Sequence, residues 1–180
     1  MISVFELFKI GIGPSSSHTV GPMKAGAGFI AALAAAGGLD QVVRLQVDLL
    51  GSLAWTGKGH DTDKAALLGL AGAAPDTVDP DWARQVMAEA REQHRLKLPN
   101  GKVIAFDPAT DIVFDTLSPT PQHPNTMHFI AFDAEGKELL RESWCSIGGG
   151  FVVRENETAE AVPASIAVPP LMTVMKARAI

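Results

Sequence analysis

The chain has 180 residues, of which 47% are hydrophobic and 19% charged, and its formal net charge is −5. This length and composition indicate about one globular domain with a sizeable core and exclude a disordered chain. The negative charge argues against nucleic acid as a partner. The single cysteine excludes an internal disulfide. Because the sequence also shows no signal-peptide pattern and no apolar run of membrane-spanning length, we predict a cytoplasmic protein that does not enter a membrane.

Residues 3–10 alternate loosely and predict a short helix or an edge strand. The segment 11–26 that follows is rich in glycine and places five polar residues in a row, namely Ser15, Ser16, Ser17, His18 and Thr19. A helix predicted over 23–36 comes next, and Gly37 ends it. Free N–H groups and the dipole at a helix N-terminus favour an anion, so this segment predicts a binding loop for a carboxylate or phosphate. The alternative is an ordinary serine or threonine helix cap.

Residues 42–50 alternate between apolar and polar side chains and predict a strand with one polar face, as in an antiparallel sheet covered on one side. A glycine-rich loop is predicted over 51–63, and a second helix follows it and ends at Gly72. His60 lies just before this second helix, as His18 lies before the first. Because a helix N-terminus disfavours the imidazolium, both histidines are expected to be neutral and to act as bases or hydrogen-bond partners. The alternative for each is a hydrogen bond that anchors its loop.

The second half of the chain predicts one more helix and then strands. The helix begins at 79–81 with an acidic cap and a proline, and its apolar stripe of Trp82, Val86 and Ala90 is assigned to the core. A hairpin turn is predicted at 99–101 and a further turn at 107–110. Strands are predicted at 103–106, 112–114, 128–132 and 138–146, and the last two are expected to pair as a hairpin. A loop at 118–125 carries three prolines, and the three glycines at 148–150 form either an anion nest or a flexible bend.

Four motifs occur in order along the chain: GIGPSSSHTVGPMKAG at 11–26, GSL at 51–53, TGKGH at 56–60 followed by Thr62 and Asp63, and SIGGGF at 146–151. Together they resemble the N-terminal (beta) domain of the bacterial iron–sulfur L-serine dehydratases, also called L-serine ammonia-lyases. The resemblance covers about residues 1–153. It implies an α+β fold with a largely antiparallel sheet and helices packed on one face, similar to the allosteric substrate-binding domain of phosphoglycerate dehydrogenases.

The resemblance also implies an activity, a cofactor and partners. The family removes water from L-serine by β-elimination to give pyruvate and ammonia, with a [4Fe-4S] cluster as Lewis acid and without pyridoxal phosphate. The cluster ligands are cysteines of a C-terminal catalytic (alpha) domain, and Cys145 alone cannot replace them. We therefore expect no metal in this chain, no activity of the chain by itself, L-serine and the catalytic domain as partners, and a homodimer in the full enzyme. Residues 154–180 are expected to be a linker or a tail that needs a partner.

By the same resemblance, His18 and His60 are the candidate catalytic residues, and either one could handle the proton. The substrate-binding candidates are Ser15, Ser16, Ser17, Thr19, Thr62, His123 and Asn125. The candidates for loop support are Lys58, Asp63, Gly148 and Gly149. Asn125 could instead form a turn. Two alternatives remain for the function: an amino-acid-binding regulatory module, and a hydrolase built on a serine with His60 and Asp63, which lacks a nucleophile-elbow motif.

Overall fold

The computed structural model describes residues 15–155. The predicted element at 3–10 and nearly all of the tail predicted at 154–180 lie outside this range. The helical elements are α2 (Val20–Ala35), α3 (Ser52–Thr56), the 3₁₀ turn η1 (Gly57–His60), α4 (Thr62–Leu70), α5 (Pro80–Gln93) and α6 (Pro108–Asp111). The strands are β1 (Arg44–Leu50), β2 (Arg95–Lys97), β3 (Val103–Ala105), β4 (Ile112–Asp115), β5 (Thr126–Phe132), β6 (Glu138–Gly148) and β7 (Phe151–Arg154).

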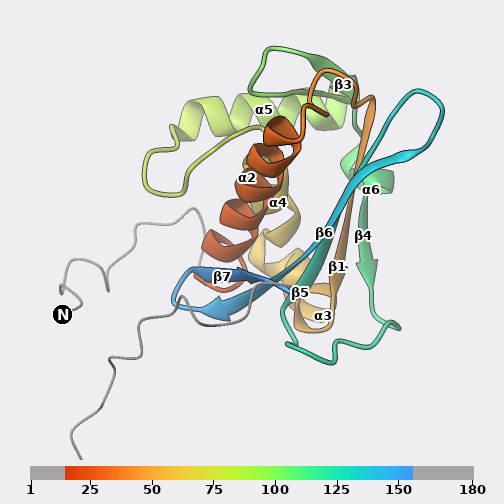
Figure 1. Cartoon of the computed structure of the whole chain (residues 1–180). Coiled ribbons are helices and arrows are strands. Elements are labelled where there is room, and N and C mark those ends of the chain that lie inside the picture. Colours follow the sequence, from red (N-terminus) through yellow and green to blue (C-terminus); the bar gives the residue numbers. More distant parts are fainter. Residues whose placement is uncertain (1–14, 156–180) are drawn as a thin grey trace, which may run out of the picture.

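Five strands form one sheet in the order β4-β1-β5-β6-β7, and β2 and β3 form a separate hairpin (Figure 1). Strand β1 runs antiparallel to β5 and parallel to β4, and the β5–β6 and β6–β7 pairs are antiparallel. The predicted α+β class with a largely antiparallel sheet is therefore confirmed. The likeness to the phosphoglycerate dehydrogenase domain remains a prediction.

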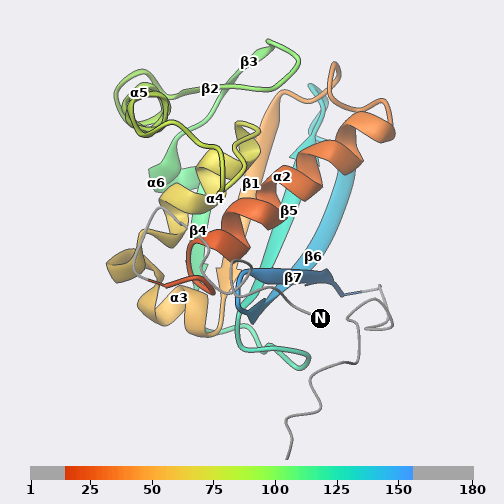
Figure 2. The ribbon, with the colours of Figure 1, turned by 90° about the vertical axis from the view of Figure 1, so that its left-hand side faces the viewer.

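The helices cover one face of the large sheet. Helix α2 crosses this face, α4 lies beside it, and α5 and the small hairpin lie together at one end (Figure 2). The opposite face of β1 is polar, since Arg44 donates to Gln46 at 3.1 Å and Gln46 donates to Asp48 at 2.7 Å. Leu45, whose side chain alternates with these, is fully buried. The alternation predicted for this strand is confirmed.

The core lies between the sheet and helix α2. Phe29 of α2 stacks on Phe129 of β5 with ring centroids 5.5 Å apart. Helix α4 reaches the core because small residues allow its backbone to touch that of α2. A Cβ added at Gly69 would lie 2.2 Å from the carbonyl oxygen of Met23, and one added at Gly26 would lie 2.9 Å from that of Ala66. The two helices therefore pack backbone against backbone, which any larger side chain at these glycines would prevent.

Several predicted ends and turns are confirmed. Gly37 and Gly72 adopt positive φ angles of 71° and 88° at the ends of α2 and α4. The Asp79 carboxylate caps α5 by accepting from the N–H groups of Asp81 and Trp82 at 2.9 and 2.8 Å. The hairpin turns predicted at 99–101 and between β5 and β6 are also present.

Other predictions about local structure were wrong. The segment 51–63 is not a loop but contains α3 and η1, which are too short to show a hydrophobic period. The turn predicted at 107–110 is mostly helix α6, and strand β7 was missed. In the predicted apolar stripe of α5, Ala90 is fully buried and Val86 packs against the core, as expected, but Trp82 is 39% exposed and Ala83 beside it is buried in its place. Within residues 15–155, no helix combines the length and hydropathy needed to cross a membrane.

Candidate functional site

The two predicted histidines lie together at one end of the domain. His18 belongs to the turn that leads into α2, and His60 ends the η1 turn that follows α3. Their ring centroids are 4.9 Å apart with an interplanar angle of 43°. The fold therefore joins the serine-rich segment and the TGKGH segment into one cluster, which we call the histidine cluster and define as Ser15, Ser17, His18, Ser52, Thr56 and His60.

Both ring nitrogens of His18 are engaged. Its Nε2 lies 2.9 Å from Thr56 Oγ1, and its Nδ1 lies 3.0 Å from Ser17 Oγ. Ser17 Oγ in turn lies 3.2 Å from Ser15 Oγ. Ser52 Oγ is 3.5 Å from Nε2, at the limit of a hydrogen bond. The His18 ring is thus held between two elements by hydroxyl groups.

His60 is held from one side only. Its Nδ1 lies 2.9 Å from the carbonyl oxygen of Thr56. A carbonyl oxygen accepts hydrogen bonds and cannot donate, so Nδ1 must carry the proton. In neutral His60 the lone pair then lies on Nε2, and within residues 15–155 this nitrogen has no hydrogen-bond partner. Because the His60 side chain is only half-buried and stays partly accessible, its Nε2 can accept a proton from a ligand.

The pKa of His18 lies below its ordinary value of 6.5. The largest cause is partial burial of the imidazole, and the second is repulsion from a positive charge on the adjacent His60. A backbone hydrogen bond involving Ser52 opposes both by raising the pKa. The sequence predicted a neutral His18 from the dipole of the following helix, whereas the structure assigns the lowered pKa to burial and to the second histidine.

This lowered pKa predicts a pH-dependent stability. Between the pKa of folded His18 and 6.5, the unfolded chain binds more protons than the folded chain, so the free energy of unfolding increases as pH rises through this interval. The contribution is complete above 6.5 and is lost as pH falls through the folded pKa. Urea denaturation from about pH 5 to about pH 8 measures it. Relative to the unmodified chain, His18→Gln should show a smaller loss of stability on acidification, and equal losses in the two would contradict this.

Several backbone N–H groups of the predicted anion-binding loop donate hydrogen bonds to carbonyl groups of the same segment. The N–H groups of His18 and Thr19 donate to the carbonyl of Ser15 at 3.2 and 2.9 Å, and that of Gly21 donates to Ser16 at 2.9 Å. The turn thus continues α2 toward the N-terminus. A ligand at this loop would meet hydroxyl groups, with the exposed Ser16 the most accessible, rather than these three amides.

Two substrate-binding candidates are buried. Thr19 is 1% exposed and donates from Oγ1 to the carbonyl of Ser15 at 2.6 Å. Thr62 is fully buried, and its Oγ1 has no hydrogen-bond partner. A Cβ added at Gly57 would lie 3.2 Å from this oxygen, so Thr62 packs directly beneath the η1 turn. Neither hydroxyl is exposed to a ligand in this conformation, and both contact the segments that carry the histidines.

His123 and Asn125 form a structured loop beside α3. The His123 Nδ1 accepts from the N–H group of Asn125 at 3.0 Å, and Asn125 Nδ2 donates to the carbonyl of Ser146 at 3.2 Å. The N–H group of Ser52 donates to the carbonyl of Pro124 at 2.7 Å. The loop therefore connects the histidine cluster to the β6–β7 turn. Both residues therefore hold this loop in place, and their roles in substrate binding stay predictions.

The loop-support candidates lie in two places. Gly148 and Gly149 have φ angles of 97° and 59° and form the tight turn from β6 to β7. The carbonyl of the next glycine, Gly150, accepts from Lys24 at 3.0 Å, which joins this turn to α2. Lys58 Nζ lies 5.1 Å from the centroid of the Phe114 ring, a cation–π contact that ties η1 to β4.

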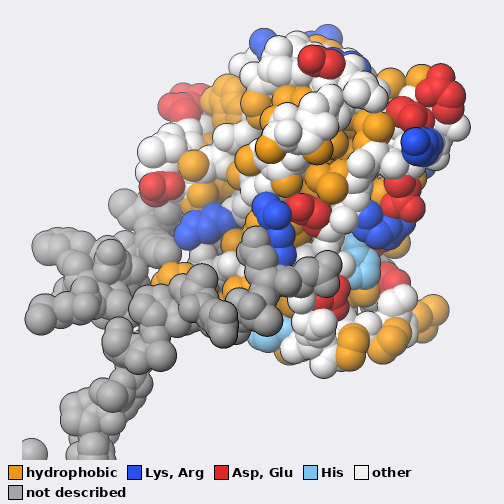
Figure 3. Space-filling view, viewed as in Figure 1, with side chains coloured by type: hydrophobic (Ala, Val, Ile, Leu, Met, Phe, Trp, Pro, Cys, Tyr) orange, Lys and Arg blue, Asp and Glu red, His pale blue; other side chains and the backbone are white. Residues whose placement is uncertain are grey.

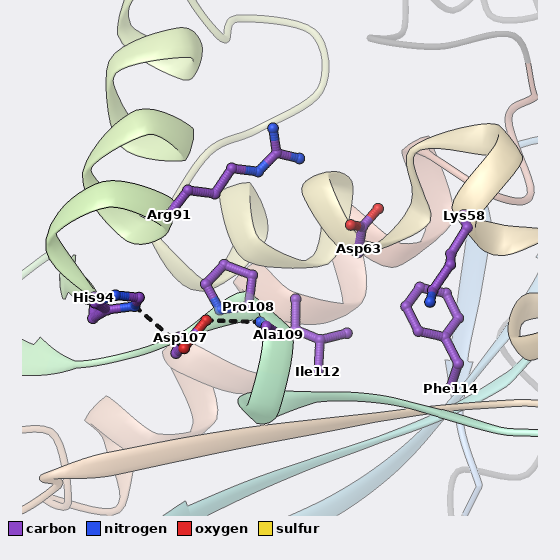
Figure 4. Close-up of a pocket in the computed structure, with 9 residues that line it drawn as sticks. All are labelled: Lys58, Asp63, Arg91, His94, Asp107, Pro108, Ala109, Ile112 and Phe114. Carbon is purple, nitrogen blue, oxygen red and sulfur yellow. Dashed lines mark hydrogen bonds and ion pairs between the residues drawn. The ribbon is translucent and has the colours of Figure 1, made fainter.

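Lys58 and Asp63 also line an open groove of about 480 Å³ between α4, α5 and β4 (Figure 4). Arg91 stands on its α5 side, and at its far end the His94 Nδ1 lies 3.2 Å from an Asp107 carboxylate oxygen. The groove does not include either member of the histidine pair. Because Asp63 lines this groove while His60 Nδ1 binds the Thr56 carbonyl, the Ser-His-Asp arrangement of the hydrolase alternative is not assembled.

The residues of the chain do not fit an iron–sulfur cluster. Cys145 is its single cysteine and is 3% exposed on β6, with Sγ 3.5 Å from Thr126 Oγ1. Over the described range 15–155, no group of three or more histidine, cysteine or acidic side chains could hold a metal ion. A cluster held by cysteine thiolates would need ligands from elsewhere.

Ser52 and Thr56 are site residues that the sequence reasoning did not assign. They lie four residues apart and therefore on one face of a helix, and Thr56 donates to the Ser52 carbonyl at 2.8 Å. Because the sequence predicts a loop over 51–63, it gives no reason to place these two hydroxyl groups on one helical face. On the face shown in Figure 3, acidic and basic side chains are interspersed and form no continuous basic surface.

The fold and the site together define an α+β domain that presents paired histidines and hydroxyl groups beside the N-terminus of its first described helix. The model of the family "Serine dehydratase beta chain" matches residues 3–157. The chain belongs to this family.

Similar curated proteins carry the name L-serine dehydratase. The chain is 46% identical over 155 residues to the L-serine dehydratase of Helicobacter pylori, and the aligned region covers 86% of this chain and 33% of the relative. It is 43% identical over 169 residues to L-serine dehydratase 1 of Escherichia coli (94% and 37%) and 45% identical over 173 residues to the enzyme of Mycobacterium tuberculosis (93% and 37%). The chain thus spans about a third of the length of these relatives.

Proposed function

We propose that this chain is the beta portion of an L-serine dehydratase, which converts L-serine to pyruvate and ammonia, and that it acts in the cytoplasm. The observation that carries this proposal is the histidine pair, which the fold assembles from two of the family's motifs. β-Elimination of water requires a base for the α-proton. Histidine is the side chain whose ordinary pKa suits proton transfer near neutral pH.

Of the two histidines, His60 suits the role of base. Its Nδ1 proton is held by the Thr56 carbonyl, so Nε2 offers a lone pair to the substrate. Both ring nitrogens of His18 are hydrogen-bonded, Nδ1 to Ser17 and Nε2 to Thr56, so this ring has a fixed position beside His60. Hydroxyl groups of the serine-rich turn, above all the exposed Ser16, would bind polar groups of the amino acid.

The catalytic domain is the partner that this proposal requires. Relatives are about three times longer than the matched region, so they contain ample chain for a second domain. We propose that this second domain supplies the cysteine ligands of a [4Fe-4S] cluster, because Cys145 is single and buried. The histidine cluster would then form one wall of a site shared by the two domains.

An experiment on the chain by itself tests whether the cluster is bound by another domain. After anaerobic reconstitution with iron and sulfide, we expect it to stay colourless and to release no pyruvate from L-serine, because it lacks the thiolates. Absorption spectroscopy and a pyruvate assay make the measurement. A brown chain that turns over L-serine would overturn the assignment of the cluster to another domain.

The alternative of an amino-acid-binding regulatory module gains support from the groove. Its lining carries both Arg91 and Asp63, which suit a carboxylate and an ammonium group. Calorimetric titration of the chain with L-serine separates the two possibilities. Binding that is lost in Arg91→Ala but kept in His60→Ala would favour the module, and the reverse pattern would favour the histidine cluster.

A further inference from the structure

Thr56 contacts both histidines of the cluster, through different atoms. Its Oγ1 lies 2.9 Å from His18 Nε2, and its carbonyl oxygen lies 2.9 Å from His60 Nδ1. Its hydroxyl proton is already committed, because Thr56 Oγ1 donates to the carbonyl of Ser52 at 2.8 Å. A threonine hydroxyl has one proton to donate. Oγ1 can therefore meet His18 only as an acceptor.

This count of protons fixes which nitrogen is protonated on each ring. Since Thr56 Oγ1 accepts, His18 must carry a proton on Nε2, and since the Thr56 carbonyl accepts, His60 must carry one on Nδ1. We propose that Thr56 is a positioning residue that holds the neutral His18 and His60 in opposite tautomers. The use of these tautomers in catalysis rests on the proposed function, whereas the tautomers themselves do not.

The assignment at His18 also sets the direction of the serine hydroxyls. With its proton on Nε2, neutral His18 accepts at Nδ1 from Ser17 Oγ, 3.0 Å away. The single proton of Ser17 is thereby used, so Ser15 must be the donor in the 3.2 Å contact between the two serines. The chain of hydrogen bonds runs from Ser15 through Ser17, His18 and Thr56 to the carbonyl of Ser52. The proton of Ser15 is thus used in its bond to Ser17, and its lone pairs can accept from a group that donates, such as the ammonium of an amino acid.

Imidazole ¹⁵N NMR of the 180-residue chain, at a pH above 6.5 where His18 is neutral, tests the assignment directly. We expect a protonated Nε2 with an unprotonated Nδ1 for His18, and the opposite pattern for His60. The same tautomer on both rings, or the two patterns exchanged, would overturn the proposal. This measurement needs neither a partner domain nor turnover, so its outcome is independent of whether the chain proves to be part of a dehydratase.

Variants of α3 assign the effect to the Thr56 hydroxyl. In Thr56→Val, His18 Nε2–H loses its 2.9 Å acceptor and keeps only its contacts with Ser52, so its proton should exchange faster with water and its signal should weaken, while the His60 Nδ1 proton keeps its backbone acceptor and its signal. Thr56→Ser should restore the His18 signal. Ser52→Ala is the matched comparison and should weaken the His18 signal far less than Thr56→Val does, because it removes only the 3.5 Å contact and leaves the Ser52 carbonyl that fixes the Thr56 hydroxyl. An unchanged exchange rate of the His18 proton in Thr56→Val would refute the role of Thr56. The tautomers of the unmodified chain remain decisive if this variant folds poorly.

Discussion

Replacing His60 by alanine should lower turnover of L-serine by about two to four orders of magnitude in an enzyme assembled from this chain and a catalytic domain. The reason is that His60 Nε2 is the nitrogen of the pair whose lone pair can receive a proton. Stability should change far less, because the half-buried ring makes one hydrogen bond to a backbone carbonyl, worth about 1 kcal/mol. Steady-state kinetics and urea denaturation of the same variant measure the two effects.

The control for His60→Ala is a substitution at His94. Its side chain is 61% exposed and lies outside the histidine cluster. Alanine would be a poor choice there, because the backbone has a positive φ of 49°, and His94→Asn suits that conformation better. His94→Asn should leave turnover nearly unchanged. Near-normal turnover in His60→Ala would mean that the cluster is structural or regulatory, and the binding-module alternative would then take precedence.

The substitution Gly69→Ala should destabilise the fold by about 3 kcal/mol, at the upper end of the range for overpacked cores. The added Cβ would lie 2.2 Å from the Met23 carbonyl oxygen and 3.1 Å from the Ala27 nitrogen. Both are backbone atoms of α2, so no side chain can rotate to relieve the clash and the two helices must separate. The free energy of unfolding from urea titration measures the loss.

Gly59→Ala is the matched control for this prediction. A Cβ added at Gly59 would meet nothing within 4 Å, and Gly59 is not among the residues with a positive φ. Its free energy of unfolding should therefore lie within about 0.5 kcal/mol of the unmodified chain. If Gly69→Ala proved as stable as Gly59→Ala, the close backbone packing of α2 and α4 would be refuted.

Much of the fold could be predicted because its signals are local. The alternation in β1, the cap at Asp79 and the glycines after α2 and α4 each determine a strand, a helix start or a helix end by themselves. The missed elements α3, η1 and α6 have four or five residues, too few for a hydrophobic period to develop. Their form depends on contacts made far along the chain, such as the bond from Ser52 to Pro124.

The site was predictable in part for the same reason. The pattern of a histidine before each of two helices indicated His18 and His60, but nothing local could indicate that their rings lie 4.9 Å apart. The burial of Thr19 and Thr62 likewise follows from packing against neighbouring segments and not from their hydroxyl groups. Thr56 was missed because its role depends on which atoms of two distant histidines it meets.

The central claim is that this chain supplies the histidine cluster to the active site of an L-serine dehydratase. The most direct test is a fusion of this chain to the part of Escherichia coli L-serine dehydratase 1 that the chain does not match. The fusion is reconstituted anaerobically with iron and sulfide, and pyruvate formation from L-serine is then measured. We expect turnover from the fusion, none from either part alone, and a loss of about two to four orders of magnitude when the fusion carries His60→Ala. A fusion without turnover, while the same catalytic portion is active with its own N-terminal portion, would contradict the claim.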